Sequence, residues 1–232
     1  MHPQNGNHPS PTWITALENE ARTLLMELET QPAARRLFEG RVDAEAYALY
    51  LVRTYHYVRW TTPLLAEAGQ RMKTQGRHVG LGELLLRKAA EEHGHERWLL
   101  ADLKALGWSA ERVERTDPGP AVIAYIAWNR FTSRVGRPEA FLGTAYVLEY
   151  LSVHRASQAV RGLLAADTIP GIRKAVTFLR AHGGEDIGHV AELTELLGPL
   201  RDREEQSALL LSAHLTRVLY RGLFEEAVTP AH

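Results

Sequence analysis

Residues 79–107 read VGLGELLLRKAAEEHGHERWLLADLKALG, and this stretch decides how the rest of the chain is interpreted. Its leucines recur at steps of three and four residues, which is the spacing of one face of an α-helix. The stretch ends at Gly107, a typical stop signal for a helix. We therefore expect one helix over residues 79–107. Its buried face is predicted to pass through Leu81, Leu84, Leu85, Lys88, Glu92, His95, Leu99 and Leu103.

The rest of the chain repeats this helical pattern between proline and glycine breaks. Further helices are expected over about 12–30, 43–70, 120–135, 138–166, 171–197 and 203–227, with a short helical turn over 33–39. No stretch shows the alternation of apolar and polar residues that is typical of a strand. We predict an all-α, single-domain bundle of six to seven long helices over residues 12–232. Residues 1–11 are polar and proline-rich, and we expect a disordered leader there.

Composition excludes several classes of function. The 232 residues carry 27 Lys and Arg against 28 Asp and Glu, a net charge of −1, so neither nucleic acid nor an anionic membrane is an expected partner. Cysteine is absent while 11 histidines are present, so a metal would need nitrogen and oxygen ligands. The N-terminus lacks the pattern of a secretion signal, and no apolar run is long enough to cross a bilayer. The expected location is the cytoplasm.

Two predicted helices carry carboxylates on faces that should be buried. The spacing of Glu92 and His95 directs one carboxylate and one imidazole to the same place, which is how helical bundles supply half of a di-iron or di-manganese site. The neighbouring Glu91, His93 and Glu96 are expected to face solvent. Glu149 stands within the apolar run FLGTAYVLEYL, where a carboxylate is costly to bury unless it is paired, hydrogen-bonded or bound to metal.

The sequence HGGEDIGH over residues 182–189 is the strongest motif. Its spacings of four and three residues place His182, Asp186 and His189 on one helical face, a ligand set that suits first-row divalent metals. Its three glycines each cost about 1 kcal/mol in a helix, which indicates a close approach of another helix or a substrate, or a local deformation of the helix. Together the motifs predict a metal site formed by Glu92, His95, Glu149, His182, Asp186 and His189.

The order of these motifs resembles that of the heme-oxygenase-like di-iron oxidases, often called iron-containing redox enzymes, within the wider superfamily of TenA, PqqC and heme oxygenase. Residues 90–107 and 178–189 look most like the metal helices of that family, and the likeness extends from about 12 to 227. The resemblance implies a seven-helix fold without heme. It also implies two bound irons and the use of dioxygen to oxidise small organic acids or amines.

One position departs from the family pattern. Some members carry an acidic ligand about two turns before the first histidine, where this chain has Lys88. Either Glu92 replaces that ligand, or the second iron site is weak, or Lys88 has a chemical role of its own.

Two alternatives to an iron oxidase stay open. A cofactor-independent oxidase similar to PqqC also gathers histidines in its core, although the last motif argues against it. A non-catalytic module that binds a ligand or a partner is the alternative from a different class. Other branches fit less well, because the thiaminase-like branch uses a catalytic cysteine and heme oxygenases use a first-helix histidine. This chain has no histidine between Pro9 and Tyr55.

No catalytic residue can be assigned from the sequence, but three residues are candidates for a substrate pocket. They are His56, Arg59 and Lys88, of which the arginine suits a substrate carboxylate because it forms bidentate pairs. The aromatic residues around His56 are expected to belong mainly to the core. The last helix is more apolar than one buried face requires, so we expect a homodimer.

Overall fold

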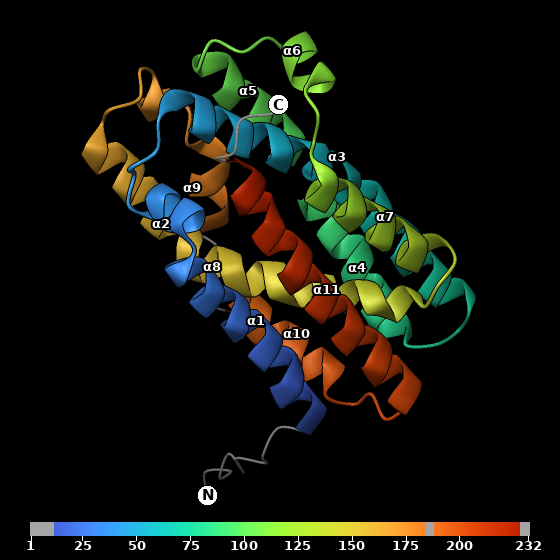
Figure 1. Ribbon diagram of the computed structural model, residues 1–232. Helices are drawn as coiled ribbons and strands as arrows, with labels where there is room; N and C mark the ends of the chain where they lie inside the picture. The colour runs from blue at the N-terminus through green and yellow to red at the C-terminus, as the bar shows by residue number, and fades with distance from the viewer. Residues whose placement is uncertain (1–11, 184–187, 228–232) are drawn as a thin grey trace, which may run out of the picture.

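The computed structural model describes residues 12–183 and 188–227, and every regular element in this part of the chain is helical (Figure 1). The predicted all-α class is therefore confirmed. The predicted number of helices is wrong, because the described residues form eleven α-helices and two short 3₁₀ helices. They are α1 (Thr12–Thr30), α2 (Pro32–Phe38), α3 (Ala44–Thr74), α4 (Val79–Glu91), α5 (His95–Ala105), α6 (Ala110–Arg115), α7 (Pro120–Arg134), η1 (Pro138–Ala140), α8 (Phe141–Ala166), η2 (Ile172–Lys174), α9 (Thr177–Gly183), α10 (Gly188–Leu197) and α11 (Arg203–Ala227).

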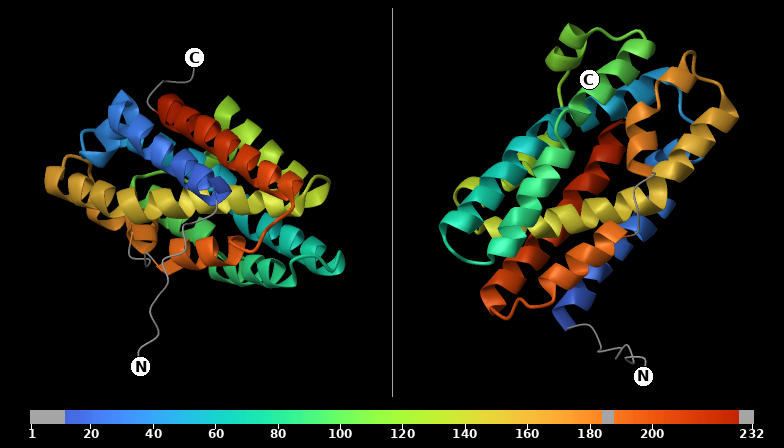
Figure 2. Two further views of the ribbon diagram at one scale, coloured as in Figure 1. Left: turned by 90° about the horizontal axis from the view of Figure 1, so that it is seen from below. Right: turned by 180° about the vertical axis from the view of Figure 1, so that it is seen from behind.

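The long helices form the bundle. The C-terminal helix α11 packs against α1, α7 and α8, while α3 packs against α4, α5 and α7. Figure 2 shows from two further sides that α1 and α11 lie side by side and that α8 crosses them. The face of α1 that repeats at three and four residues is buried as its spacing predicts. Asp43 caps α3, since its Oδ1 accepts a hydrogen bond from the Ala46 backbone N at 2.8 Å.

Three expected helices differ from the structure. The helix expected over 79–107 is two helices, α4 and α5. The helix expected from 171 begins as an α-helix only at Thr177, because Gly171 adopts a positive φ of 82° and a separate 3₁₀ turn follows it. The helix expected from 138 begins with a 3₁₀ turn. The short helix α6, which Ser109 caps, was not predicted.

None of the helices in the described part of the chain is long and apolar enough to span a membrane. The leader predicted over residues 1–11 lies outside the described residues.

Candidate metal centre

Glu92 and His95 lie at a break between two helices. Helix α4 ends at Glu91 and α5 begins at His95, with Gly94 between them at a φ of 89°. Glycine adopts this left-handed conformation at little cost, so the chain changes direction there and the continuous helix predicted over 79–107 is wrong. The two side chains still meet as the spacing predicted, because His95 Nδ1 lies 2.9 Å from Glu92 Oε2.

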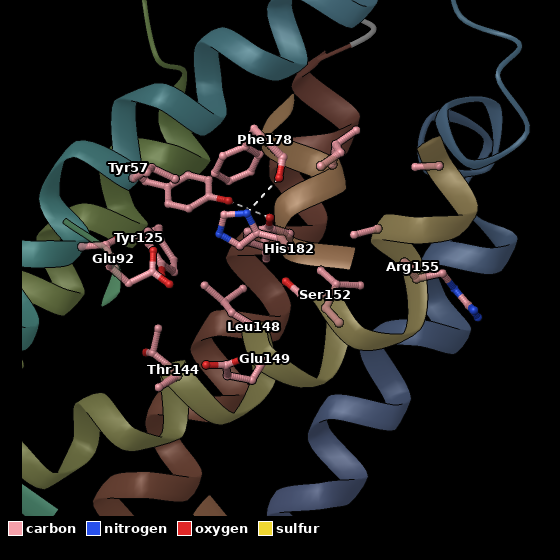
Figure 3. Close-up of a pocket in the computed structure, with 18 of the residues that line it drawn as sticks. Tyr57, Glu92, Tyr125, Thr144, Leu148, Glu149, Ser152, Arg155, Phe178 and His182 are labelled. Carbon is pink, nitrogen blue, oxygen red and sulfur yellow. Dashed lines mark hydrogen bonds between the residues drawn. The ribbon is translucent and has the colours of Figure 1, made fainter. Parts of the chain in front are cut away.

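His182 of α9 completes a group of three possible metal ligands. One donor atom each from Glu92, His95 and His182 lies within 4.8 Å of the other two. Donors bound to one ion at about 2.0–2.2 Å each are at most about 4.4 Å apart, so a small movement of side chains would close this group around one ion. The residues therefore fit a single divalent metal ion. Figure 3 shows Glu92, at the end of α4, and His182 of α9 directed toward each other.

The two imidazoles are held by stacked aromatic rings. The His95 ring stacks on Trp98 with a centroid distance of 4.1 Å, and it meets the His182 ring edge to face at 5.1 Å. The His182 ring lies 4.1 Å from that of Phe178, and His182 Nδ1 lies 2.9 Å from the Phe178 backbone O. When Nδ1 donates its proton to that carbonyl, Nε2 is the nitrogen presented to a metal.

Asp102, which was not predicted as a site residue, fixes α9 against α5. Its side chain is fully buried, and its two oxygens accept hydrogen bonds from the backbone N of Thr177 at 3.0 Å and of Phe178 at 2.9 Å. Burial raises the pKa of Asp102, and the two backbone N–H groups act in the opposite direction. Because Asp102 lies on the helix of His95 and caps the helix of His182, it holds the two candidate ligands together.

The carboxylate of Glu92 is kept ionised by its neighbours. Burial acts to raise its pKa, but the hydrogen bond to His95 and the charges of His182, His95 and Lys88 lower the pKa overall. A deprotonated carboxylate is the form that binds a metal ion.

A cavity of about 130 Å³ lies beside the three candidate ligands, and Glu92 and His182 line it. Its walls are mostly apolar and aromatic (Figure 3). Tyr57 and Tyr220 give it a polar edge, with their hydroxyl oxygens 2.8 Å apart. The aromatic residues of α3 were expected mainly in the core. Some of them, such as Tyr57, line the cavity, and the sequence pattern alone does not distinguish a residue of the cavity wall from a core residue.

Lys88 and Glu149 both line this cavity, and they are paired. Lys88 Nζ lies 2.5 Å from Glu149 Oε1, and the lysine is 6% exposed. Glu149 is therefore beside the centre, but it is not among the three residues whose donor atoms lie within 4.8 Å. In Figure 3 the guanidinium of Arg155 points away from the cavity, where it pairs with Glu29.

The other predicted site residues are placed as follows. Asp186 lies outside the described residues, and His189 is in α10 with a side chain that is not described. His56 is buried and its ring contacts Tyr55, while Arg59 is exposed over the same tyrosine. Neither of these two residues is among those that line the cavity.

The close approach indicated by the glycines of the last motif is present at Gly183. A Cβ added there would lie 2.6 Å from the side-chain oxygen of Ser157, so α9 and α8 touch at this point. The Ser157 hydroxyl also donates a hydrogen bond to the Gly183 carbonyl at 2.7 Å.

The described helices adopt the heme-oxygenase-like fold, as comparison with solved structures shows. A domain of unknown function with this fold from Shewanella denitrificans is 25% identical, with a TM-score of 0.76, over 92% of this chain and 91% of that one. A TenA homolog from Pseudomonas syringae pv. tomato is 16% identical, with a TM-score of 0.79, over 98% and 97%. A TenA homologue from P. horikoshii is 16% identical, with a TM-score of 0.73, over 93% and 97%.

The sequence identifies the family. Residues 48–222 match the iron-containing redox enzymes, and the chain belongs to this family. A comparison with curated proteins finds no match. The resemblance inferred from the order of the motifs is thereby confirmed.

Proposed function

We propose that the chain is an iron-dependent oxidoreductase that uses dioxygen to oxidise a small organic acid or amine. The observation that carries this proposal is the convergence of Glu92, His95 and His182 beside an apolar cavity. Carboxylate and imidazole groups are ligands that suit iron. Membership of a family of iron-containing redox enzymes supports iron over other divalent metals.

When bound, iron would supply the electrons that reduce dioxygen. The chain's own residues position the reactants and exclude water. Phe178 holds the His182 ring through its carbonyl, and apolar side chains such as Leu148 and Leu179 keep the space beside the ligands dry. Burial raises the pKa values of Tyr57 and Tyr220 well above the ordinary range, so both hydroxyls stay neutral. One hydroxyl donates to the other at 2.8 Å, which leaves the second O–H of the pair to donate a hydrogen bond to a substrate.

The size of the cavity limits the substrate. Its volume of about 130 Å³ is close to that of an apolar cavity of about 150 Å³ that accommodates benzene. The portion of the substrate that sits beside the ligands is therefore small.

Oxygen uptake by the iron-loaded protein tests this function. The wild-type protein should consume dioxygen in the presence of at least one small acid or amine, and His95→Ala should not. His93→Ala is the matched control, because His93 lies two residues away and is exposed. Iron binding without oxygen uptake would instead favour a non-catalytic module, and oxygen uptake without iron would favour a cofactor-independent oxidase.

We also propose that the protein forms a homodimer through α11. The exposed apolar side chains of Leu211 and Val218 on this helix support the proposal. Light scattering during gel filtration tests it, and a monomer would contradict it.

A further inference from the structure

Lys88 places a positive charge beside Glu149 at the candidate metal centre. Its ammonium nitrogen lies 2.5 Å from Glu149 Oε1, and its charge also acts on Glu92, one of the three close ligands. All three side chains line the same cavity. Lys88 therefore pairs with Glu149 in the cavity that Glu92 also lines.

The burial of Lys88 shows that this placement is specific. Lysine is almost never fully buried unless it is paired, and at 6% exposure Lys88 depends on a partner such as Glu149. Helix α4 brings the lysine to the cavity from one side and α8 brings the glutamate from the other. The pair thus links α4 and α8 at the cavity.

The charges of the described residues suit one metal ion better than two. Glu92 and Glu149 carry two negative charges, and Lys88 cancels one of them. A second divalent ion bound to Glu149 would lie next to the lysine ammonium in a cavity of low polarity, where like charges repel strongly. The ion and the ammonium would also compete for the same carboxylate oxygens.

We propose that the Lys88 ammonium takes the place of a second metal ion. The centre then binds one divalent ion through Glu92, His95 and His182, while Glu149 remains paired with Lys88. This inference rests on the proposed function, since it assumes that the three close residues bind metal.

Counting bound ions tests the inference without any need for activity. The metal-free wild type and Lys88→Met are titrated with Co²⁺, and bound cobalt per chain is measured after gel filtration together with the visible absorption of the bound ion. Lys104→Met is the matched control, because Lys104 is exposed on α5. We expect one Co²⁺ in the wild type and in Lys104→Met. In Lys88→Met we expect two, because the ammonium no longer occupies the place beside Glu149 that a second ion would take.

Other counts would overturn the inference. Two ions in the wild type, or a single ion in both the wild type and Lys88→Met, would show that Lys88 does not exclude a second metal, and the proposed function would stand. No ion in any of these proteins would overturn the inference and the metal centre together.

If Lys88→Met does not fold, Glu149→Gln provides the test. The inference predicts one Co²⁺ per chain, with a Kd within about threefold of the wild-type value, because Glu149 is not a ligand of the first ion. A loss of more than about tenfold, the range expected when a group that supports a metal is removed, would contradict it.

Discussion

Replacing Asp102 by alanine should both destabilise the protein and weaken metal binding. The change leaves the buried backbone N–H of Phe178 and the part-buried backbone N–H of Thr177 without their acceptor. Each unsatisfied group costs about 1–3 kcal/mol. Part of this is offset, because the buried carboxylate is itself costly, as its raised pKa indicates. We therefore expect the free energy of unfolding to fall by about 2–4 kcal/mol.

For a chain of this length, such a loss corresponds to a decrease in Tm of about 5–15 °C. The start of α9 would no longer be fixed to α5, and His182 would lose its alignment with His95. Removing residues that orient metal ligands typically costs about 10–100-fold in affinity, so the Kd for Co²⁺ should rise by at least about tenfold.

Asp43→Ala is the matched control for Asp102→Ala. Asp43 also caps a helix through one backbone N–H, but it is exposed and lies on a helix that carries none of the three close ligands. Its loss should cost about 1 kcal/mol and leave the Kd for Co²⁺ unchanged. Thermal unfolding by circular dichroism and cobalt titration measure both effects. The reasoning is refuted if Asp102→Ala matches Asp43→Ala in both Tm and cobalt affinity.

Three other predictions test separate parts of the structure. The pKa of Glu92 is lowered in the folded state, so its contribution to stability is present above pH about 4.3 and is lost as the pH falls through the folded value. In urea unfolding of the metal-free protein, the difference in the free energy of unfolding between wild type and Glu92→Gln should therefore shrink from pH 6 to pH 3.5. Gly143→Ala should lower the free energy of unfolding, measured in urea, by about 1–3 kcal/mol, because the new Cβ would lie 2.2 Å from the Leu209 carbonyl O. Gly80→Ala is the control and should not destabilise the protein, because no heavy atom lies within 4 Å of a Cβ placed there. Ala156→Phe should fill the cavity and lower oxygen uptake at least tenfold while the iron content stays constant, and unchanged uptake would show that substrate binds elsewhere.

The helices with one apolar face were predictable from the sequence. Helices α1 and α11 lie within a residue or two of their expected bounds, because a continuous apolar stripe and clear stop signals define them. The break at Gly94 was not predicted, since the same leucine stripe continues on both sides of it. A glycine inside a helical pattern is compatible with a helix or with a turn, and only the tertiary contacts decide between them.

The candidate site was predictable in part. The spacing of Glu92 and His95 and the position of His182 led to the three residues that converge. The partner of Glu149 was not predictable, because spacing along one helix gives no information about which residue of another helix faces it. Asp102 was missed although a signal was present, since a carboxylate directly beside Leu103 on a buried face needs buried partners.

The location of bound iron tests the central claim most directly. Crystals grown from the iron-loaded protein under anaerobic conditions can be measured at the iron absorption edge, where anomalous scattering locates the metal. We predict a peak at about 2.0–2.2 Å from donor atoms of Glu92, His95 and His182. An iron peak elsewhere in the chain, with these three side chains unliganded, would contradict the proposed metal centre.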